Sequence, residues 1–238
     1  MKLLVSPRDV EEAKAVIRGN ADIIDVKNPK EGSLGANFPW IIKSIKELVE
    51  KEKGEGVKLS AAIGDFDYKP GTASLAALGA ASAGAEYIKV GLFKIKTRQE
   101  AIDLLTGVVK AVKSFDPTKE VVAAFYSDYK RINSLSPFEI MEIGEEVDID
   151  VAMVDTGIKD GRSTLEFLSA EELKTFVSES KALGLETALA GSLTFEDLPA
   201  IKEINPDIIG VRGMVCGGNR EDRVRPELVR ELKRMVTE

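Results

Sequence analysis

Short apolar runs alternate with longer amphipathic segments along the whole chain, and this alternation is the strongest constraint on its fold. Strict alternation of strands and helices predicts parallel strands that are joined by helical crossovers. The predicted strands lie near residues 2–5, 22–27, 58–64, 86–91, 120–126, 150–155, 185–190 and 207–212. The predicted helices lie near residues 8–19, 38–51, 72–84, 97–114, 137–146, 169–183, 194–203 and 226–236.

Length then selects among the parallel α/β architectures. The chain has 238 residues. Eight strand–helix units in a chain of this length fit a closed (β/α)8 TIM barrel better than an open sheet, because such a barrel typically needs about 250 residues. No linker, low-complexity tract or shift in composition divides the chain. We therefore expect residues 1–238 to form a single (β/α)8 barrel domain.

Two local predictions accompany this assignment. Ser6 is expected to cap the first helix, with Pro7 in its first turn and Gly19 at its end. Phe38, Trp40 and Ile41, in the second helix, are expected to pack in the core rather than to form a stacking platform.

Composition excludes several classes of enzyme. The chain contains no histidine, which removes the Ser-His and Cys-His nucleophile pairs and every histidine-containing metal site. Its single cysteine, Cys216, excludes an intramolecular disulfide and a multi-cysteine zinc cluster. Proton transfer in such an enzyme must fall to Lys, Asp, Glu, Tyr or water. Carboxylates could still bind a magnesium ion, but the sequence contains no dense acidic cluster, and we expect neither a bound metal nor a cofactor.

Charge and hydropathy constrain the partners and the location. The net charge is −7, from 33 basic and 40 acidic residues, which is unlike the overall charge of a nucleic-acid-binding protein. No apolar run is long enough for a signal peptide or a membrane span. We expect a soluble cytoplasmic protein without a nucleic-acid or membrane partner.

Charged residues alternate with apolar ones in three of the predicted strands. Alternate residues of a barrel strand face the lumen, and the C-terminal strand ends carry the active site. Asp25 and Lys27 share the parity opposite to that of their apolar neighbours, and Lys89 likewise lies between apolar residues. Asp155 ends the sixth strand on the parity that we assign to the lumen, and Lys159 follows in the next loop. We therefore expect all five side chains around one space.

Lysines in such a space suggest imine chemistry. A lysine that is partly desolvated, or that lies near other cations, has a lowered pKa and a larger neutral, nucleophilic fraction. A second lysine or a carboxylate can then transfer the protons that imine chemistry requires. The alternative for a single lysine is that it reaches past the strand end to solvent. For Lys27 and Lys89 together we favour the catalytic interpretation, whereas Asp25 and Asp155 fit either proton transfer or a structural counter-ion.

Two glycine-containing segments indicate a phosphate site. Gly191 and Ser192 follow the seventh predicted strand, and Arg212 and Gly213 close the eighth. In barrels of this kind, the loops after these two strands often bind phosphate through backbone N–H groups. The alternative is ordinary turn glycines and solvated arginines. Further glycines and arginines in the last loop extend the signal: Gly217, Gly218, Arg220, Arg223 and Arg225.

The segment Asp25–Ala36, which reads DVKNPKEGSLGA, resembles the signature of the (5-formylfuran-3-yl)methyl phosphate synthase family of methanofuran biosynthesis. The resemblance spans essentially the whole chain. It continues through residues 69–72 (KPGT), 87–92 (YIKVGL), 155–161 (DTGIKDG), 189–192 (LAGS) and 210–213 (GVRG).

The resemblance implies a single (β/α)8 barrel that is a lyase. The family combines two molecules of glyceraldehyde 3-phosphate into a phosphorylated furan aldehyde, releasing one phosphate and two waters. By resemblance, Lys27 forms the imine and Lys89 transfers protons, while Asp25, Asp155 and Lys159 match further active-site positions. The partner implied is a small triose phosphate, and we expect a homo-oligomer.

Two other interpretations remain open. A phosphosugar isomerase or epimerase would use the same barrel and phosphate loops without a covalent lysine. A non-catalytic interaction protein would have no reason to direct Lys27, Lys89 and Asp155 into the lumen.

Overall fold

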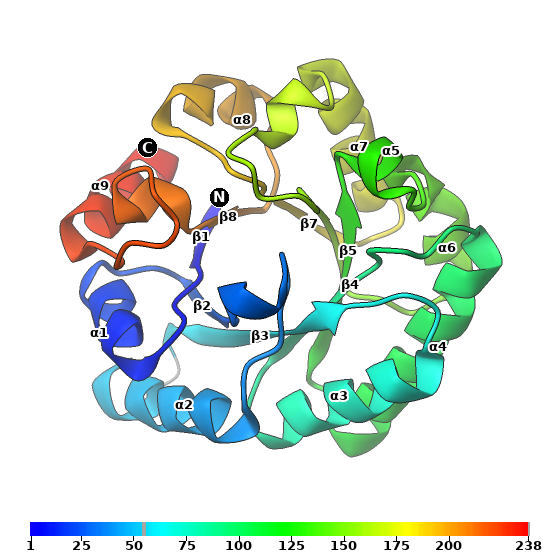
Figure 1. Cartoon of the computed structure of the whole chain (residues 1–238), viewed down its shortest axis with the longest axis horizontal. Helices are drawn as coiled ribbons and strands as arrows, with labels where there is room; N and C mark the ends of the chain where they lie inside the picture. The colour runs from blue at the N-terminus through cyan, green and yellow to red at the C-terminus, as the bar shows by residue number, and fades with distance from the viewer. Residues whose placement is uncertain (54–55, 238) are drawn as a thin grey trace.

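The computed structural model describes residues 1–53 and 56–237, and it confirms the predicted barrel. Its parallel strands pair in chain order, and the last strand pairs with the first to close the ring (Figure 1). The strands are β1 (Lys2–Val5), β2 (Ile23–Val26), β3 (Lys58–Asp65), β4 (Tyr87–Gly91), β5 (Glu120–Tyr126), β6 (Val151–Asp155), β7 (Glu186–Leu189) and β8 (Ile208–Val211). Each lies within about two residues of its predicted position, because apolar runs between turn residues define strands well.

Helices surround the ring of strands. They are α1 (Val10–Arg18), α2 (Pro39–Lys53), α3 (Pro70–Ser82), α4 (Arg98–Phe115), α5 (Tyr129–Ile132), α6 (Ile140–Glu146), α7 (Ala170–Ala182), α8 (Leu198–Ile204) and α9 (Pro226–Thr237). The short α5 is absent from the sequence prediction, because four residues are too few to show helical periodicity. Short 3₁₀ turns occupy Pro29–Glu31, Pro137–Glu139, Thr164–Glu166, Phe195–Asp197 and Gly213–Cys216.

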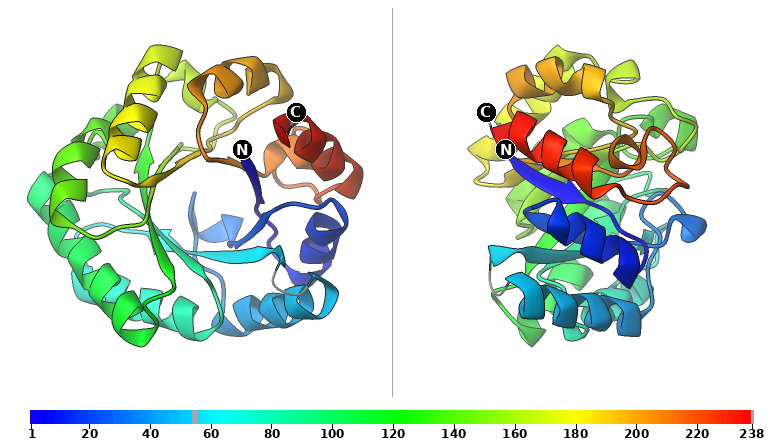
Figure 2. Two further views of the ribbon diagram at one scale, coloured as in Figure 1. Left: turned by 180° about the vertical axis from the view of Figure 1, so that it is seen from behind. Right: turned by 90° about the vertical axis from the view of Figure 1, so that its left-hand side faces the viewer.

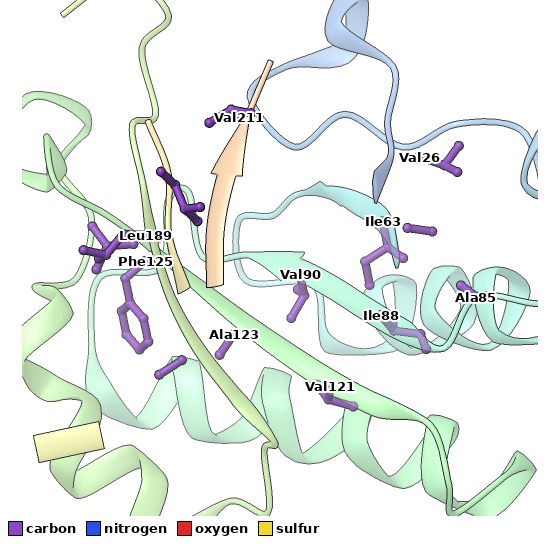
Figure 3. Close-up of a cluster of buried hydrophobic side chains, with 14 of the residues drawn as sticks. Val26, Ile63, Ala85, Ile88, Val90, Val121, Ala123, Phe125, Leu189 and Val211 are labelled. Carbon is purple, nitrogen blue, oxygen red and sulfur yellow. The ribbon is translucent and has the colours of Figure 1, made fainter. Parts of the chain in front are cut away.

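Two separate apolar clusters result from the alternation of side chains along the strands. Outward residues such as Val26, Ile88 and Val90 pack with the helices in the larger cluster (Figure 3). Inward residues such as Met153 fill the lumen in a smaller cluster. The predicted parity of the strands is therefore correct, and the inward positions that are not apolar become available for chemistry.

The first helix begins later than predicted. Asp9, not Ser6, caps α1, because the Glu12 N–H donates to the Asp9 carboxylate at 2.8 Å. The Ser6 hydroxyl instead donates to Asp25 at 2.8 Å, inside the barrel. Gly19 ends the helix as predicted.

The prediction that Phe38 and Trp40 pack in the core is wrong. They are 51% and 62% exposed, and their rings stack on each other with centroids 4.6 Å apart. The face of α2 that packs on the barrel is formed by Ile42, Ile45 and Val49. Trp40 lies outside this stripe of helical periodicity.

A carboxylate precedes every even-numbered strand and accepts a hydrogen bond from the backbone of the strand before it. The four bonds run from Leu3 N to Asp22, from Leu59 N to Glu86, from Val121 N to Asp150 and from Thr187 N to Asp207, at 2.7–3.0 Å. Each carboxylate also pairs with a lysine on a surrounding helix: Lys233, Lys46, Lys113 and Lys181, respectively. These contacts fix the register at the amino-terminal end of the barrel.

The two ends of the barrel differ in content. Both chain termini lie at one end, whereas the loop after β2 projects from the other, where the strands finish (Figure 2). Among the described residues, no helix is both long and apolar enough to cross a membrane.

Candidate active site

A cavity of about 490 Å³ opens at the carboxyl ends of the strands, in the size range of small-molecule sites. Lys27, Lys89, Asp155 and Lys159 all lie in its wall. The structure thus brings side chains from β2, β4, β6 and the loop after β6 to one space, as the strand parity predicts. Asp25 lies directly behind them and is wholly buried. The catalytic roles of these residues remain predictions.

The loop between β2 and α2 closes the part of the barrel mouth next to β3 (Figure 1). Leu34 is wholly buried in the lumen cluster, and its N–H donates to the Asp65 carboxylate at 3.1 Å. The Ser33 hydroxyl donates to the Thr156 carbonyl at 2.8 Å on the far side of the barrel. Gly32 has a φ of +130°, and a Cβ there would lie 2.3 Å from the Asp65 carboxylate. Much of the Asp25–Ala36 signature therefore shapes the mouth.

Lys89 and Asp25 form a buried ion pair. The Lys89 Nζ lies 2.6 Å from one Asp25 oxygen, and neither side chain is more than 2% exposed. Ser6 and Ser60 also donate to this carboxylate, at 2.8 and 2.7 Å. Burial alone would raise the pKa of Asp25, but the positive charges of Lys89 and Lys27 hold that pKa below its usual value. Asp25 is therefore an anion that fixes the position of the Lys89 amine.

Lys159 and Asp155 form a second pair at the cavity wall. The Lys159 Nζ donates to the Asp155 carboxylate and, at 3.0 Å, to the Thr156 hydroxyl. Burial opposes ionisation of Asp155, but the charges of Lys159 and Lys27 lower its pKa to about 2. Asp155 is therefore also ionised near neutral pH.

Lys27 differs from the other two lysines. Within the described part of the chain, no hydrogen bond or ion pair holds its Nζ, although the side chain is only 6% exposed. Burial lowers the pKa of Lys27 to about 7; nearby Asp155 opposes this shift and Lys89 adds to it. A large fraction of Lys27 is thus a neutral amine at neutral pH, and an unprotonated amine that faces a cavity is a nucleophile for carbonyl carbons.

The glycine loop after β7 forms another part of the wall. Gly191 and Ser192 line the cavity in left-handed conformations, with φ of +102° and +50°. A Cβ on Gly191 would lie 2.2 Å from the Thr164 hydroxyl oxygen, so this position requires glycine. The N–H groups of Gly191 and Ser192 have no acceptor among the described residues. They are available to an anion, and Gly213 lines the same cavity. Phosphate binding by these residues remains a prediction.

Arg212 lines the cavity, as expected of a phosphate-binding residue, but its hydrogen bonds do not support that role. Its Nη1 and Nη2 groups donate to the buried Glu12 carboxylate at 2.8 and 3.3 Å. The remaining donors reach the backbone carbonyls of Ser6, Arg220 and Asp222, at 2.7–3.4 Å. These contacts use all five N–H donors of a guanidinium. Arg212 therefore joins β8 to α1 and the last loop, and it has no donor left for substrate.

This correction changes the expected effect of Arg212→Ala from substrate binding to stability. The substitution leaves Glu12, which is 2% exposed, without its main counter-ion. Breaking a buried pair in this way typically costs about 3–5 kcal/mol. Denaturant unfolding of wild type and Arg212→Ala measures the loss, and the double variant Glu12→Gln/Arg212→Met is expected to recover part of it. If Arg212→Ala has unchanged stability and a raised KM, Arg212 binds the substrate after all.

Two residues near the lysines, the buried Tyr126 and the half-buried Asp65, were not predicted as site residues from the sequence. The Tyr126 hydroxyl donates to the Asp65 carboxylate, and burial raises the pKa values of both groups. Tyr126 ends β5 on its inward parity, which was a usable signal. Asp65 follows a bulge in the pairing of β3 with β4, and an extra residue at a bulge breaks the alternation rule.

Within the described residues, no three acidic or cysteine side chains gather as a metal site.

Comparison with known proteins identifies close relatives. The family model of 4-HFC-P synthase matches residues 3–233. A (5-formylfuran-3-yl)methyl phosphate synthase of Methanosarcina acetivorans is 61% identical over 232 residues, which cover 98% of this chain and 97% of the relative. The enzyme of the same name from Methanocaldococcus jannaschii is 54% identical over 237 residues, covering 99% of each chain.

Solved structures with similar folds are much more distant in sequence. KGPDC from Streptococcus mutans superposes with a TM-score of 0.66 at 13% identity, over 99% of this chain and 97% of the other. 3-Hexulose-6-phosphate synthase from Salmonella typhimurium gives 0.65 at 18% identity, over 100% and 99%. These likenesses show the barrel fold and carry no information about chemistry.

Proposed function

Because the chain belongs to the 4-HFC-P synthase family, we propose that it makes (5-formylfuran-3-yl)methyl phosphate from two molecules of glyceraldehyde 3-phosphate, through an imine on Lys27. The names of the relatives support the product, and the family resemblance supports the triose phosphate. The observation that carries the mechanism is the state of Lys27. Lys27 lines the cavity, its Nζ has no hydrogen-bond or ion-pair partner among the described residues, and its pKa is about 7.

The reaction begins when the Lys27 amine adds to the carbonyl carbon of one triose phosphate and water leaves. The protonated imine withdraws electrons, so a base can remove the proton from the neighbouring carbon to give an enamine. The enamine carbon then forms a bond to the carbonyl carbon of the second triose phosphate.

Elimination, ring closure and dehydration complete the sequence. Loss of one phosphate and of water leads to the aromatic furan, and hydrolysis of the imine returns the Lys27 amine. Overall, two triose phosphates give the furan aldehyde phosphate, one phosphate and two waters. No oxidant or reductant is required, so lysines and carboxylates that transfer protons suffice for these steps.

The two ion pairs supply the proton transfers. Lys89 is the proton-transfer residue in this proposal, with Asp25 at 2.6 Å as its counter-ion and proton partner. Lys159 lies in the same wall, where Asp155 fixes its amine, and it is placed to donate a hydrogen bond to the reacting carbonyl oxygen. Both carboxylates also hold the amines of Lys89 and Lys159 in ion pairs, which leaves the Lys27 amine as the unpaired one of the three.

Incubation with glyceraldehyde 3-phosphate tests the proposal. We expect a furan aldehyde phosphate by mass spectrometry, with one inorganic phosphate released for each furan formed. Sodium borohydride added during turnover should give a stable mass increase that peptide mapping assigns to Lys27. Conversion to another triose phosphate, with neither furan nor adduct, would favour the isomerase interpretation.

The pKa of Lys27 also predicts how its reactivity depends on pH. Since only the neutral amine reacts, modification of Lys27 by an amine-acylating reagent should accelerate as the pH rises through about 7 and then level off. Ordinary exposed lysines, with a pKa of about 10.4, should continue to accelerate at alkaline pH. Mass-spectrometric mapping measures all sites in one sample. A Lys27 profile that follows the surface lysines would contradict the lowered pKa.

A further inference from the structure

Arg220 lines the active-site cavity and carries a buried hydrogen-bond donor without a partner among the described residues. In residues 1–53 and 56–237, two buried side-chain polar atoms have no hydrogen-bond partner, Ser180 Oγ and Arg220 Nη2. Ser180 lies in α7, away from the cavity lining, whereas Arg220 lines the cavity with Lys27 and Lys159. A buried donor on a charged group is costly to leave unpaired, so Arg220 calls for an acceptor.

The last loop holds Arg220 in this place. Left-handed Gly217 and Gly218, with φ of +82° and +96°, turn the chain back after the 3₁₀ turn Gly213–Cys216. The Gly218 N–H donates to the Gly213 carbonyl at 2.9 Å. A Cβ on Gly213 would lie 3.8 Å from the Arg220 Cβ, so the side chain leaves the loop directly above Gly213.

Arg212 fixes the same loop through the backbone. Its Nε donates to the Arg220 carbonyl at 2.9 Å. This bond anchors Arg220 beside the end of β8 and involves no atom of the Arg220 side chain. Arg212 is therefore a positioning residue for Arg220, and side-chain substitutions at Arg220 leave the contact between Arg212 and Glu12 in place.

Among the described residues, no close ion pair neutralises the Arg220 guanidinium, although the charge of Asp155 acts on it. The nearest ion-pair contact is 3.9 Å, from Nε to a carboxylate oxygen of Glu221, whose side chain is 67% exposed. The Arg220 side chain itself is 22% exposed. Burial lowers the pKa of Arg220, but a guanidinium stays protonated at any working pH. The cavity therefore contains a positive charge with a free donor, together with the free N–H groups of Gly191 and Ser192.

We propose that Arg220, rather than Arg212, binds the phosphate group of the triose phosphate in this cavity, with the Gly191 and Ser192 N–H groups as further donors. The ligand is a phosphate monoester dianion, for which a guanidinium offers paired N–H donors. This proposal rests on the proposed function for the identity of the substrate. The phosphate subsite can nevertheless be tested without the imine reaction.

Binding of inorganic phosphate provides that test. Titration calorimetry compares wild type, Arg220→Gln and the matched control Arg223→Gln, which removes the same charge from an exposed position of the same loop outside the cavity lining. We expect Arg220→Gln to bind phosphate about 10- to 100-fold more weakly, the usual effect of losing a hydrogen-bonded charge. Arg223→Gln should bind like wild type. Equal affinity of Arg220→Gln and wild type, or equal losses in both variants, would overturn the proposal.

Borohydride trapping then distinguishes free phosphate from the phosphate of the substrate. Wild type should form the adduct faster with glyceraldehyde 3-phosphate than with glyceraldehyde, and Arg220→Gln should lose most of this preference. Its rate with glyceraldehyde should match that of wild type, because Lys27 is unchanged. An equal loss with both aldehydes would show that Arg220 acts on Lys27 or Asp155 instead, and would overturn phosphate binding.

Two further points keep the result unambiguous. Thermal unfolding establishes that each variant is folded, and Arg220→Met, which keeps an aliphatic stem above Gly213, replaces Arg220→Gln if the latter is unfolded. If Arg220→Gln loses phosphate binding while wild type forms no adduct, the phosphate subsite is supported and the proposed function is rejected. An adduct with undiminished phosphate binding in Arg220→Gln would do the reverse.

Discussion

Lys27→Arg is expected to abolish both the borohydride-trapped adduct and the furan product. The substitution keeps a positive charge and a side chain of similar length. A guanidinium is protonated at any working pH and so cannot add to a carbonyl carbon. No other lysine can replace Lys27 easily, because Lys89 and Lys159 are each held by a carboxylate. Intact-protein mass spectrometry after borohydride measures the adduct, and furan release measures turnover.

Lys43→Arg is the matched control for Lys27→Arg. Lys43 is exposed on α2 and outside the cavity lining, so the same chemical change there should leave adduct and turnover unaltered. Binding of inorganic phosphate by Lys27→Arg should persist, which establishes that the cavity is intact. An adduct that maps to Lys89 or Lys159 in wild type would reverse the assignment of roles.

Lys89→Met is expected to reduce turnover by about 10²- to 10⁴-fold, the usual effect of losing a general acid or base. Methionine fills a similar volume in the lumen, where Lys89 is 1% exposed. Lys27 retains its amine in this variant, so the adduct should still form. The result that identifies a proton-transfer role is thus an adduct that accumulates while furan release falls.

The control for Lys89→Met concerns Asp25. Removal of the amine leaves this buried carboxylate with the Ser6 and Ser60 hydroxyls as its hydrogen-bond donors among the described residues, so some stability is lost. Thermal unfolding measures that loss separately from turnover. Turnover within a few-fold of wild type, in a folded Lys89→Met protein, would rule out the catalytic role.

The fold was predictable because the strand pattern, the helix pattern and the chain length all favour the same architecture. Apolar runs such as Val121–Tyr126 fix the strands, and helical stripes such as Ile42, Ile45 and Val49 fix the faces of the helices. The failures were local. The Asp9 cap lies three residues beyond Ser6, and both residue types can cap a helix. The Ser6 hydroxyl donates to Asp25 instead of capping the helix, and the sequence does not reveal this partner because the two residues meet only in the closed barrel.

The candidate site was predictable to the same depth. Strand parity placed Asp25, Lys27 and Lys89 correctly, because alternation is a local property. It could not separate a free lysine from a paired one, since pairing depends on contacts between strands. The same limit explains Arg212, whose partner Glu12 lies at the opposite end of the sequence. We predicted phosphate binding by Arg212 because the sequence shows that it lies at the end of β8. The sequence does not show that Glu12 and the loop carbonyls accept hydrogen bonds from all of its donors.

The carboxylates before β2, β4, β6 and β8 divide the barrel into four modules of two strands and two helices. Each module contains one carboxylate that fixes the register of its strands, here called a register lock, at the end of the barrel remote from the lysines of the active-site cavity. The four are Asp22, Glu86, Asp150 and Asp207. A lineage that arose by tandem duplication of such a module would inherit the scaffold already aligned. Its carboxyl-end loops would then be free to diversify, because substitutions there leave the register locks untouched. Evolvability in this architecture thus follows from placing stability and chemistry at opposite ends of the same strands.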